Sequence, residues 1–220
     1  VWMFAIMYDQ VEAKKEWLNL AKQGAEFLIM HGRDDNGAFY FSLDQKGSPL
    51  IQPYNIFSDC FAAMAFAALN KVEPNESYAS LAVNTFENIL RRRDNPKGIY
   101  NKTFPRTRDL KSFALPMILS NLTLEMESLL DREKVEELVP SVIHEVMEVF
   151  YQKESGLILE NVNLDGSFSN SHEGRLTSPG HAIEAMWFML DLSQKYKDEE
   201  LCQKAITIGL KTLEYGWDKE

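Results

Sequence analysis

The feature that most constrains this chain is a long-period repeat of helical stretches that end in charged residues and a turn. Three turn glycines, Gly37, Gly98 and Gly156, are separated by 61 and 58 residues, and each follows such a stretch. A period of this length indicates one supersecondary unit that recurs and buries its apolar surface against its neighbours. The sequence therefore predicts a helical repeat fold.

Two kinds of helical pattern alternate between these turns. One kind is apolar over most of its surface and rich in small residues, and the other has one charged face. The apolar stretches span residues 56–69, 113–124 and 181–192, and the charged stretches span residues 12–30, 76–90, 132–151 and 199–213. Helices buried on most sides that alternate with half-exposed helices are typical of an inner and an outer ring. The pattern predicts an all-α toroid of the (α/α) type.

Short strand-like segments are expected to connect the helices. Residues 38–43 and 157–162 are rich in β-forming residues, and they lead to further turn glycines at Gly47 and Gly166, as in small β-hairpins. Pro140 lies within the charged stretch 132–151 and is expected to kink or break that helix.

The repeat length also sets an expectation for size. A ring of six hairpins of about 60 residues each needs roughly 360 residues, whereas the chain has 220. We expect residues 1–220 to be a fragment of a single (α/α)6 barrel domain, an incomplete arc of about three and a half helical hairpins.

Composition excludes several classes of protein. The 33 acidic and 23 basic residues give a net charge of -10, the wrong sign for a nucleic-acid partner. The longest uncharged run, residues 112–124, has 13 residues, fewer than the roughly 20 that span a bilayer. We therefore expect a soluble, cytoplasmic protein with no membrane partner. Cys60 and Cys202 lack metal or redox spacing and are predicted to be buried.

The most informative segment is the start of the last apolar helix. Ser178 or Thr177 can cap it, Pro179 suits its first position, and His181 then lies in its first turn. Glu184 follows on the same face, where it can orient the imidazole. This pattern predicts a base with its carboxylate partner; the alternative is a purely structural pair. No further ligand stands at metal-binding spacing, so we expect no metal site.

Other candidates are polar residues near inner-helix starts. Glu173 and Arg175 precede the helix in a polar loop, where they can hold sugar hydroxyls or form a loop ion pair. Asp59 is a charge at the start of an apolar helix, so it is either a partner of the helix dipole or a pocket residue. Nearby aromatic residues, among them Phe57 and Phe113, offer stacking surfaces but are mostly expected in the core.

The helix start at residues 178–181 belongs to a segment that resembles a known family. Residues 178–188 read Ser-Pro-Gly-His-Ala-Ile-Glu-Ala-Met-Trp-Phe and resemble the signature of the N-acylglucosamine 2-epimerase family. Supporting similarities occur at residues 56–61, 114–117, 160–162 and 174–175, so the resemblance covers essentially the whole chain. It implies an (α/α)6 barrel.

The resemblance also implies a reaction and its residues. It implies an isomerase that interconverts N-acyl-D-glucosamine and N-acyl-D-mannosamine through acid–base catalysis at C2, with His181 as one catalytic group and Glu184 orienting it. Asp59, Glu173 and Arg175 are expected at or near the sugar. A second histidine and a pocket arginine are expected outside the chain, so we expect the fragment alone to be inactive. The resemblance implies a homodimer and ATP as an activator, but no required cofactor.

Three alternatives remain open from the sequence. A related aldose–ketose isomerase or a cellobiose 2-epimerase would use the same chemistry on another sugar. A toroid glycoside hydrolase would need two carboxylates across a pocket, which the His–Glu pattern does not favour. A non-catalytic binding protein of the same fold is the alternative from a different class.

Overall fold

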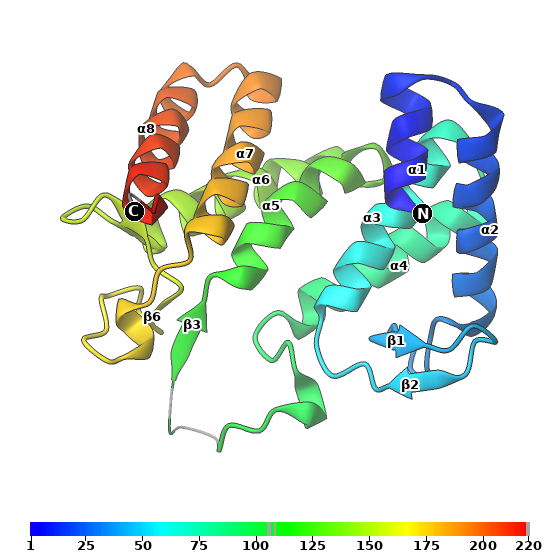
Figure 1. The fold of residues 1–220 in the computed structure, drawn as a ribbon, viewed down its shortest axis with the longest axis horizontal. Helices are drawn as coiled ribbons and strands as arrows, with labels where there is room; N and C mark the ends of the chain where they lie inside the picture. The colour runs from blue at the N-terminus through cyan, green and yellow to red at the C-terminus, as the bar shows by residue number, and fades with distance from the viewer. Residues whose placement is uncertain (105–106, 108, 219–220) are drawn as a thin grey trace. The chain divides into compact units, whose positions relative to one another are not determined.

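The structure, a computed structural model, describes residues 1–104, 107 and 109–218 and divides into two compact units. Unit 1 comprises Val1–Lys102 and Glu125–Asp131, and unit 2 comprises Thr103–Leu124 and the chain from Arg132 onward. Each unit is built mainly of paired helices joined by short strands and turns (Figure 1). The mostly helical architecture confirms the predicted all-α class.

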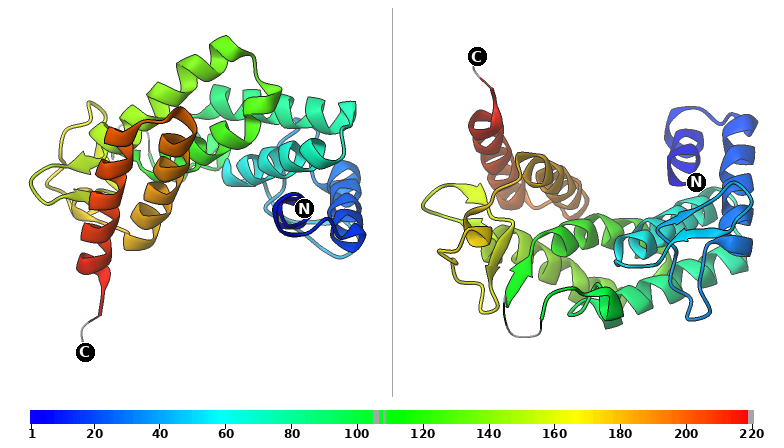
Figure 2. Two further views of the ribbon diagram at one scale, coloured as in Figure 1. Left: turned by 90° about the horizontal axis from the view of Figure 1, so that it is seen from above. Right: turned by 60° about the horizontal axis from the view of Figure 1, so that its bottom comes forward.

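Unit 1 contains the first two helical pairs. Its helices are α1 (Trp2–Ile6) with a following π-helical turn (Met7–Val11), α2 (Lys15–His31), α3 (Phe57–Val72) and α4 (Glu76–Arg92). Helix α3 packs against α4, and α1 packs against both α2 and α3. Figure 2 shows α3 and α4 side by side from two further directions.

The pair α3 and α4 confirms the predicted contrast between an apolar helix and an amphipathic one. Helix α3 buries ten of its residues, from Asp59 to Leu69, because small alanines let neighbouring segments approach on several sides. Helix α4 is capped by Asn75, whose side chain accepts the N–H of Ser77, and it buries one face through residues such as Phe86 and Ile89.

A small hairpin in unit 1 confirms the turn predicted at Gly47, but its first strand is shorter than the predicted segment 38–43. Strand β1 (Ser42–Leu43) pairs antiparallel with β2 (Pro49–Ile51). Gly47 has a φ of 88° in the intervening turn, and a Cβ there would lie 2.3 Å from Cγ of His31. The position therefore requires glycine both for its backbone conformation and for the close approach.

Unit 2 contains most of the remaining helices. They are α5 (Ala114–Met126, whose last two residues belong to unit 1), α6 (Arg132–His144) with a following π-helical turn (Glu145–Val149), α7 (Pro179–Tyr196) and α8 (Glu199–Gly216). Helix α7 packs against α8. Helix α6 continues through Pro140, so the alternative of a break there was wrong. Its apolar face, including Val135 and Val142, is buried on both sides of the proline and holds the helix together.

The strands of unit 2 differ in part from the expectation. The predicted segment 157–162 is divided between two strands, β5 (Leu157–Ile158) and β6 (Asn161–Asn163). Strand β5 pairs with β4 (Tyr151–Gln152). Strand β6 pairs antiparallel with β3 (Leu110–Ser112), which comes from a distant part of the chain. Gly166 lies in a tight turn after β6, as predicted. However, β6 pairs with the distant strand β3 and not with a strand that follows this turn.

The structure also bears on the expectations for membrane-spanning helices and for the two cysteines. None of the described helices is long and apolar enough to cross a membrane. Cys60 is buried, and burial raises the pKa of its thiol to about 12. The prediction of burial was wrong for Cys202, which is partly exposed because it lies on α8, a helix that buries only part of its surface.

Candidate active site

The start of α7 has the predicted capped geometry. The Ser178 hydroxyl oxygen accepts the backbone N–H of His181 at 3.4 Å, and Pro179 occupies the first helical position. Proline fits there because the first helical N–H has no partner within the helix. The capped start places His181 in the first turn of α7.

The imidazole of His181 is held by the carboxylate of Glu160. Its Nδ1 lies 3.0 Å from Oε1 and 3.1 Å from Oε2 of that residue. An ionised carboxylate only accepts hydrogen bonds, so Nδ1–H donates and the proton of the neutral ring resides on Nδ1. The side chain of His181 is 44% exposed, and its Nε2 has no hydrogen-bond partner among the described residues. The geometry leaves one basic nitrogen open to a ligand.

The sequence predicted a different partner for this imidazole. Glu184, three residues further along α7, makes no hydrogen bond to His181 within the described part of the chain, so the expected pair is not the one that forms. The physical reason is that Nδ1 offers a single hydrogen bond, and Glu160 already occupies it. Glu184 is partly exposed in the same first turns of the helix. A catalytic role for Glu184 stays a prediction.

The loop before α7 carries the two other candidates in unit 2. Glu173 lies in the 3-10 helix η5 (Glu173–Arg175), and its backbone carbonyl accepts from the Asn161 side chain at 3.0 Å. Arg175 is exposed, and its Nη1 donates to the backbone oxygen and to the side-chain oxygen of Asn170, both at 2.9 Å. Between them, a Cβ on Gly174 would lie 2.2 Å from the backbone oxygen of Ser169. The loop is closely packed, and the substrate-binding roles of Glu173 and Arg175 stay predictions.

Asp59 belongs to unit 1 and is fully buried. Its Oδ1 accepts the backbone N–H of Phe39 and its Oδ2 accepts from Nη1 of Arg92, each at 2.8 Å. Burial raises the pKa of Asp59, while the Phe39 N–H and the Arg92 guanidinium oppose that rise. Of the two roles left open by the sequence, this geometry favours the structural one, because the carboxylate has no exposed surface.

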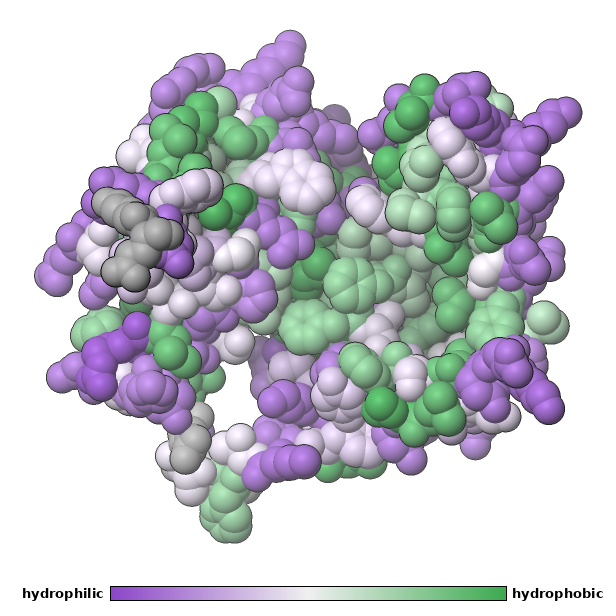
Figure 3. Space-filling model, viewed as in Figure 1, coloured by the Kyte–Doolittle hydropathy of each residue, from purple (hydrophilic) through white to green (hydrophobic). Residues whose placement is uncertain are grey.

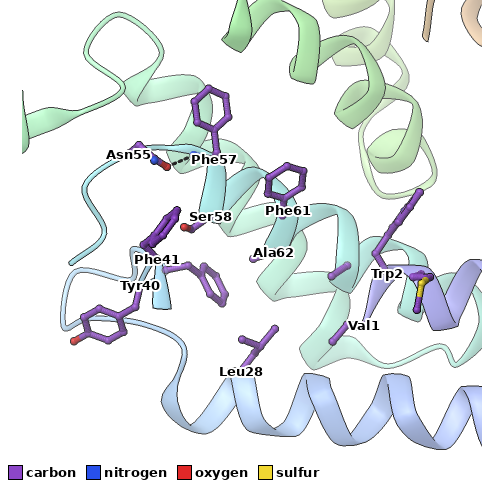
Figure 4. A pocket seen from close by; sticks show the side chains of 13 residues that line it. Val1, Trp2, Leu28, Tyr40, Phe41, Asn55, Phe57, Ser58, Phe61 and Ala62 are labelled. Atoms are coloured by element: carbon purple, nitrogen blue, oxygen red, sulfur yellow. Dashed lines mark hydrogen bonds between the residues drawn. The ribbon is translucent and has the colours of Figure 1, made fainter. Parts of the chain in front are cut away.

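The structure also has a cavity of about 450 Å³, which lies wholly in unit 1. Phe57, Phe61 and Trp2 line it, and in Figure 4 the two phenylalanines project from the same side of α3. Two polar side chains, Asn55 and Ser58, also line it. Apolar side chains gather over α1 and α3 in the view of Figure 3. Such a lining suits stacking against a ring better than proton transfer.

The aromatic residues singled out in the sequence fall into different environments. Phe57 lines the cavity, whereas Phe113 is completely buried in the core of unit 2. In the part of the chain that the structure describes, no three His, Cys, Asp or Glu residues are placed to hold a metal ion.

Comparison with known proteins places this geometry in a family. The model of the family described as N-acylglucosamine 2-epimerase (GlcNAc 2-epimerase) matches residues 1–220. The N-acylglucosamine 2-epimerase of Rattus norvegicus is 32% identical over 230 residues, which cover 100% of this chain and 54% of the relative. The cellobiose 2-epimerase of Dictyoglomus turgidum is 24% identical over 241 residues, covering 97% of this chain and 57% of the relative.

A solved structure confirms the fold. The cellobiose 2-epimerase of Bacillus thermoamylovorans superposes with a TM-score of 0.82 at 18% sequence identity, over 99% of this chain and 60% of that chain. This likeness shows that the chain has the (α/α)6 type of fold. The chain spans about half the length of the curated relatives that it matches.

Proposed function

This chain belongs to the N-acylglucosamine 2-epimerase family, and on that premise we propose that the protein interconverts N-acyl-D-glucosamine and N-acyl-D-mannosamine. The observation that carries the proposal is the half-exposed imidazole of His181, which has Nδ1 bound to Glu160 and Nε2 open. This is the arrangement that a proton-transfer catalyst needs, because one nitrogen is fixed and the other can reach a ligand.

The reaction inverts the configuration at C2 of an open-chain sugar. A base removes the proton from C2, which is acidic because it is next to the carbonyl, and an acid returns a proton to the opposite face of the planar enediolate-like intermediate. In this proposal Nε2 of His181 performs one of these transfers. The carboxylate of Glu160 stabilises the imidazolium that forms when Nε2 takes a proton.

A second acid–base group is required on the other face of C2. The resemblance to the family implies that a second histidine supplies it and that an arginine lines the pocket. Glu184, Glu173 and Arg175 are proposed to contact or orient the sugar, because all three lie near the start of α7 in unit 2 and are partly or fully exposed. Asp59 is not included, because both of its carboxylate oxygens are occupied within unit 1.

The test follows the C2 proton in deuterated water, with the protein at its natural length. N-acetylmannosamine should be converted to N-acetylglucosamine that carries deuterium at C2, as detected by proton NMR. His181→Ala should lower kcat roughly 10²–10⁴-fold, the usual contribution of a positioned acid or base. The matched control is His144→Ala, which removes an exposed imidazole from α6 and should leave kcat unchanged.

Two results would contradict the proposal. One is a wild-type protein that binds N-acetylmannosamine without converting it, which would favour a binding protein of the same fold. The other is full activity in His181→Ala. In contrast, a binding protein would keep its affinity for sugar when His181 is removed.

A second candidate function rests on the similarity to the cellobiose 2-epimerase of Dictyoglomus turgidum. The same experiment with cellobiose, glucose and mannose distinguishes the substrates by their kcat/KM values. An aldose–ketose isomerase would return the proton to C1 and yield a ketose, whereas a 2-epimerase returns it to C2. We propose the N-acyl sugar because the rat N-acylglucosamine 2-epimerase is the more similar relative, at 32% identity.

Two features implied by the family resemblance complete the proposal. We propose that the protein forms a homodimer and that ATP activates it without being consumed. Sedimentation tests the dimer. The initial rate with a non-hydrolysable ATP analogue tests the activation, because an activator that is not consumed should still raise the rate in that form.

A further inference from the structure

The carboxylate of Glu160 meets His181 in a geometry suited to fixing the ring. Its two oxygens lie almost equally far from Nδ1, at 3.0 and 3.1 Å. The Glu160 side chain is only 18% exposed, compared with 44% for His181. The contact is therefore shielded on the Glu160 side, where competition from water is weakest, while the imidazole remains accessible.

The backbone of Glu160 is fixed on both sides. Its N–H donates to the backbone oxygen of Leu176, and its carbonyl accepts the N–H of Phe113, each at 2.9 Å. Leu176 lies shortly before the capping residue of α7, and Phe113 is completely buried next to the start of α5. Strand β6 begins at the next residue and pairs with β3. These contacts hold the Glu160 carboxylate at a defined place relative to the start of α7.

Glu184 does not compete for this role. It has the helical spacing that the sequence pattern favoured, yet Glu160 holds Nδ1, and Glu184 makes no hydrogen bond to the ring among the described residues. The two glutamates therefore have different environments. One is held in a shielded position by backbone hydrogen bonds, and the other is partly exposed on α7.

We propose that Glu160 is the positioning residue of the site, which holds His181 in the Nδ1–H tautomer and so keeps Nε2 unprotonated and free to accept the C2 proton. This role rests on the proposed function. Glu160 does not touch the sugar in this scheme. It acts through His181 by fixing the ring and by stabilising the imidazolium after proton transfer.

The tautomer can be measured without any substrate. In protein at its natural length labelled with ¹⁵N-histidine, the two ring nitrogens have distinct chemical shifts, and the His181 signals are those that disappear in His181→Ala. Neutral His181 should show a protonated Nδ1. Glu160→Ala should shift the ring toward the Nε2–H form, whereas Glu148→Gln, which removes a carboxylate paired with Lys204, should not. An unchanged tautomer in Glu160→Ala would overturn the proposal.

Kinetics with chemical rescue provide the second arm. Glu160→Ala should lower kcat roughly 10²–10⁴-fold while KM stays within about threefold, because the residue acts only on proton transfer. Added formate should restore at least part of that kcat by replacing the carboxylate next to Nδ1, and it should have no effect on His181→Ala. A loss of kcat that formate does not restore, in a variant with wild-type thermal unfolding, would contradict the proposal.

The two arms separate failure of this inference from failure of the proposed function. If the wild-type protein performs no epimerisation, the proposed function fails, and the tautomer measurement still decides whether Glu160 sets the state of His181. If epimerisation occurs but Glu160→Ala has the wild-type tautomer and kcat, the function stands and the positioning role of Glu160 is wrong.

Discussion

Helices α3 and α7 both have an ionisable side chain at their third residue, but the two side chains differ in burial and in hydrogen bonding. Asp59 at the start of α3 is completely buried, and both of its oxygens accept hydrogen bonds. His181 at the start of α7 is 44% exposed, and one of its nitrogens has no partner among the described residues. Position in the helix therefore does not decide whether such a side chain is enclosed or left accessible to a ligand.

The difference lies in what closes over each helix start. At α3, Arg92 at the end of the neighbouring helix α4 neutralises the carboxylate, and the Phe39 N–H occupies its other oxygen. At α7, the partner is Glu160, which lies between β5 and β6 and occupies only one side of the ring. The enclosure is incomplete at α7, where we propose the site for chemistry.

The largest expected loss of stability follows from a substitution at the start of α3, the closed site, where Asp59 is completely buried. Asp59→Ala should lower the free energy of unfolding by roughly 3 kcal/mol, because it leaves Arg92 and the buried Phe39 N–H without their acceptor. Urea denaturation measures this loss. Asp59→Asn, which keeps an acceptor for Phe39, should lose less. If His181→Ala were as destabilising as Asp59→Ala, the contrast between the two helix starts would be wrong.

A smaller loss of stability is expected at the start of α7, the open site, where His181 is partly exposed. Ser178→Ala should cost about 1 kcal/mol of unfolding free energy, because α7 loses the side-chain oxygen that accepts the His181 N–H. Ser178→Asp, which retains an acceptor, should behave like the wild type in thermal unfolding. Helix α3 has no side-chain cap at Ile56, so its start has no equivalent contribution to lose. Equal stability of Ser178→Ala and the wild type would show that the cap contributes nothing.

The smallest expected effect is a pH dependence at the closed site. Burial raises the pKa of Asp59 above its ordinary value of 3.8, so the folded state holds this proton more tightly than the unfolded state. The contribution of Asp59 to stability should be largest below pH 3.8 and should decline as pH rises through the raised folded pKa. The difference in unfolding free energy between wild type and Asp59→Asn, followed over pH, should therefore decrease with pH. An increase of this difference with pH would show that the pKa of Asp59 is lowered in the folded state, contrary to the prediction.

The sequence was a good guide where the controlling interactions are local. The periodicity of α3, α4, α7 and α8 predicted these helices, and the Ser-Pro sequence predicted the start of α7. The turn glycines predicted the hairpin between β1 and β2, because positive φ is a local requirement.

The sequence was a poor guide where distant segments meet. Glu160 reaches His181 from a segment 21 residues earlier, and no helical spacing connects the two. Arg92 meets Asp59 across 33 residues, so no local sequence pattern connects its charge with that carboxylate. A signal for Glu160 was nevertheless present, because the segment 160–162 was among those that resembled the family. It carried no indication of which side chain would contact the imidazole.

The pairing of β3 with β6 has a consequence for the order in which the molecule assembles. Helices α7 and α8 are joined by a short turn at Lys197, so their contacts are local and should form early. Glu160 reaches its place only when Phe113 and the strand pair β3–β6 close a much longer loop. We therefore expect the carboxylate to meet His181 late in folding, and pulsed hydrogen exchange during refolding should find that the amide of Phe113 becomes protected later than those in the middle of α7.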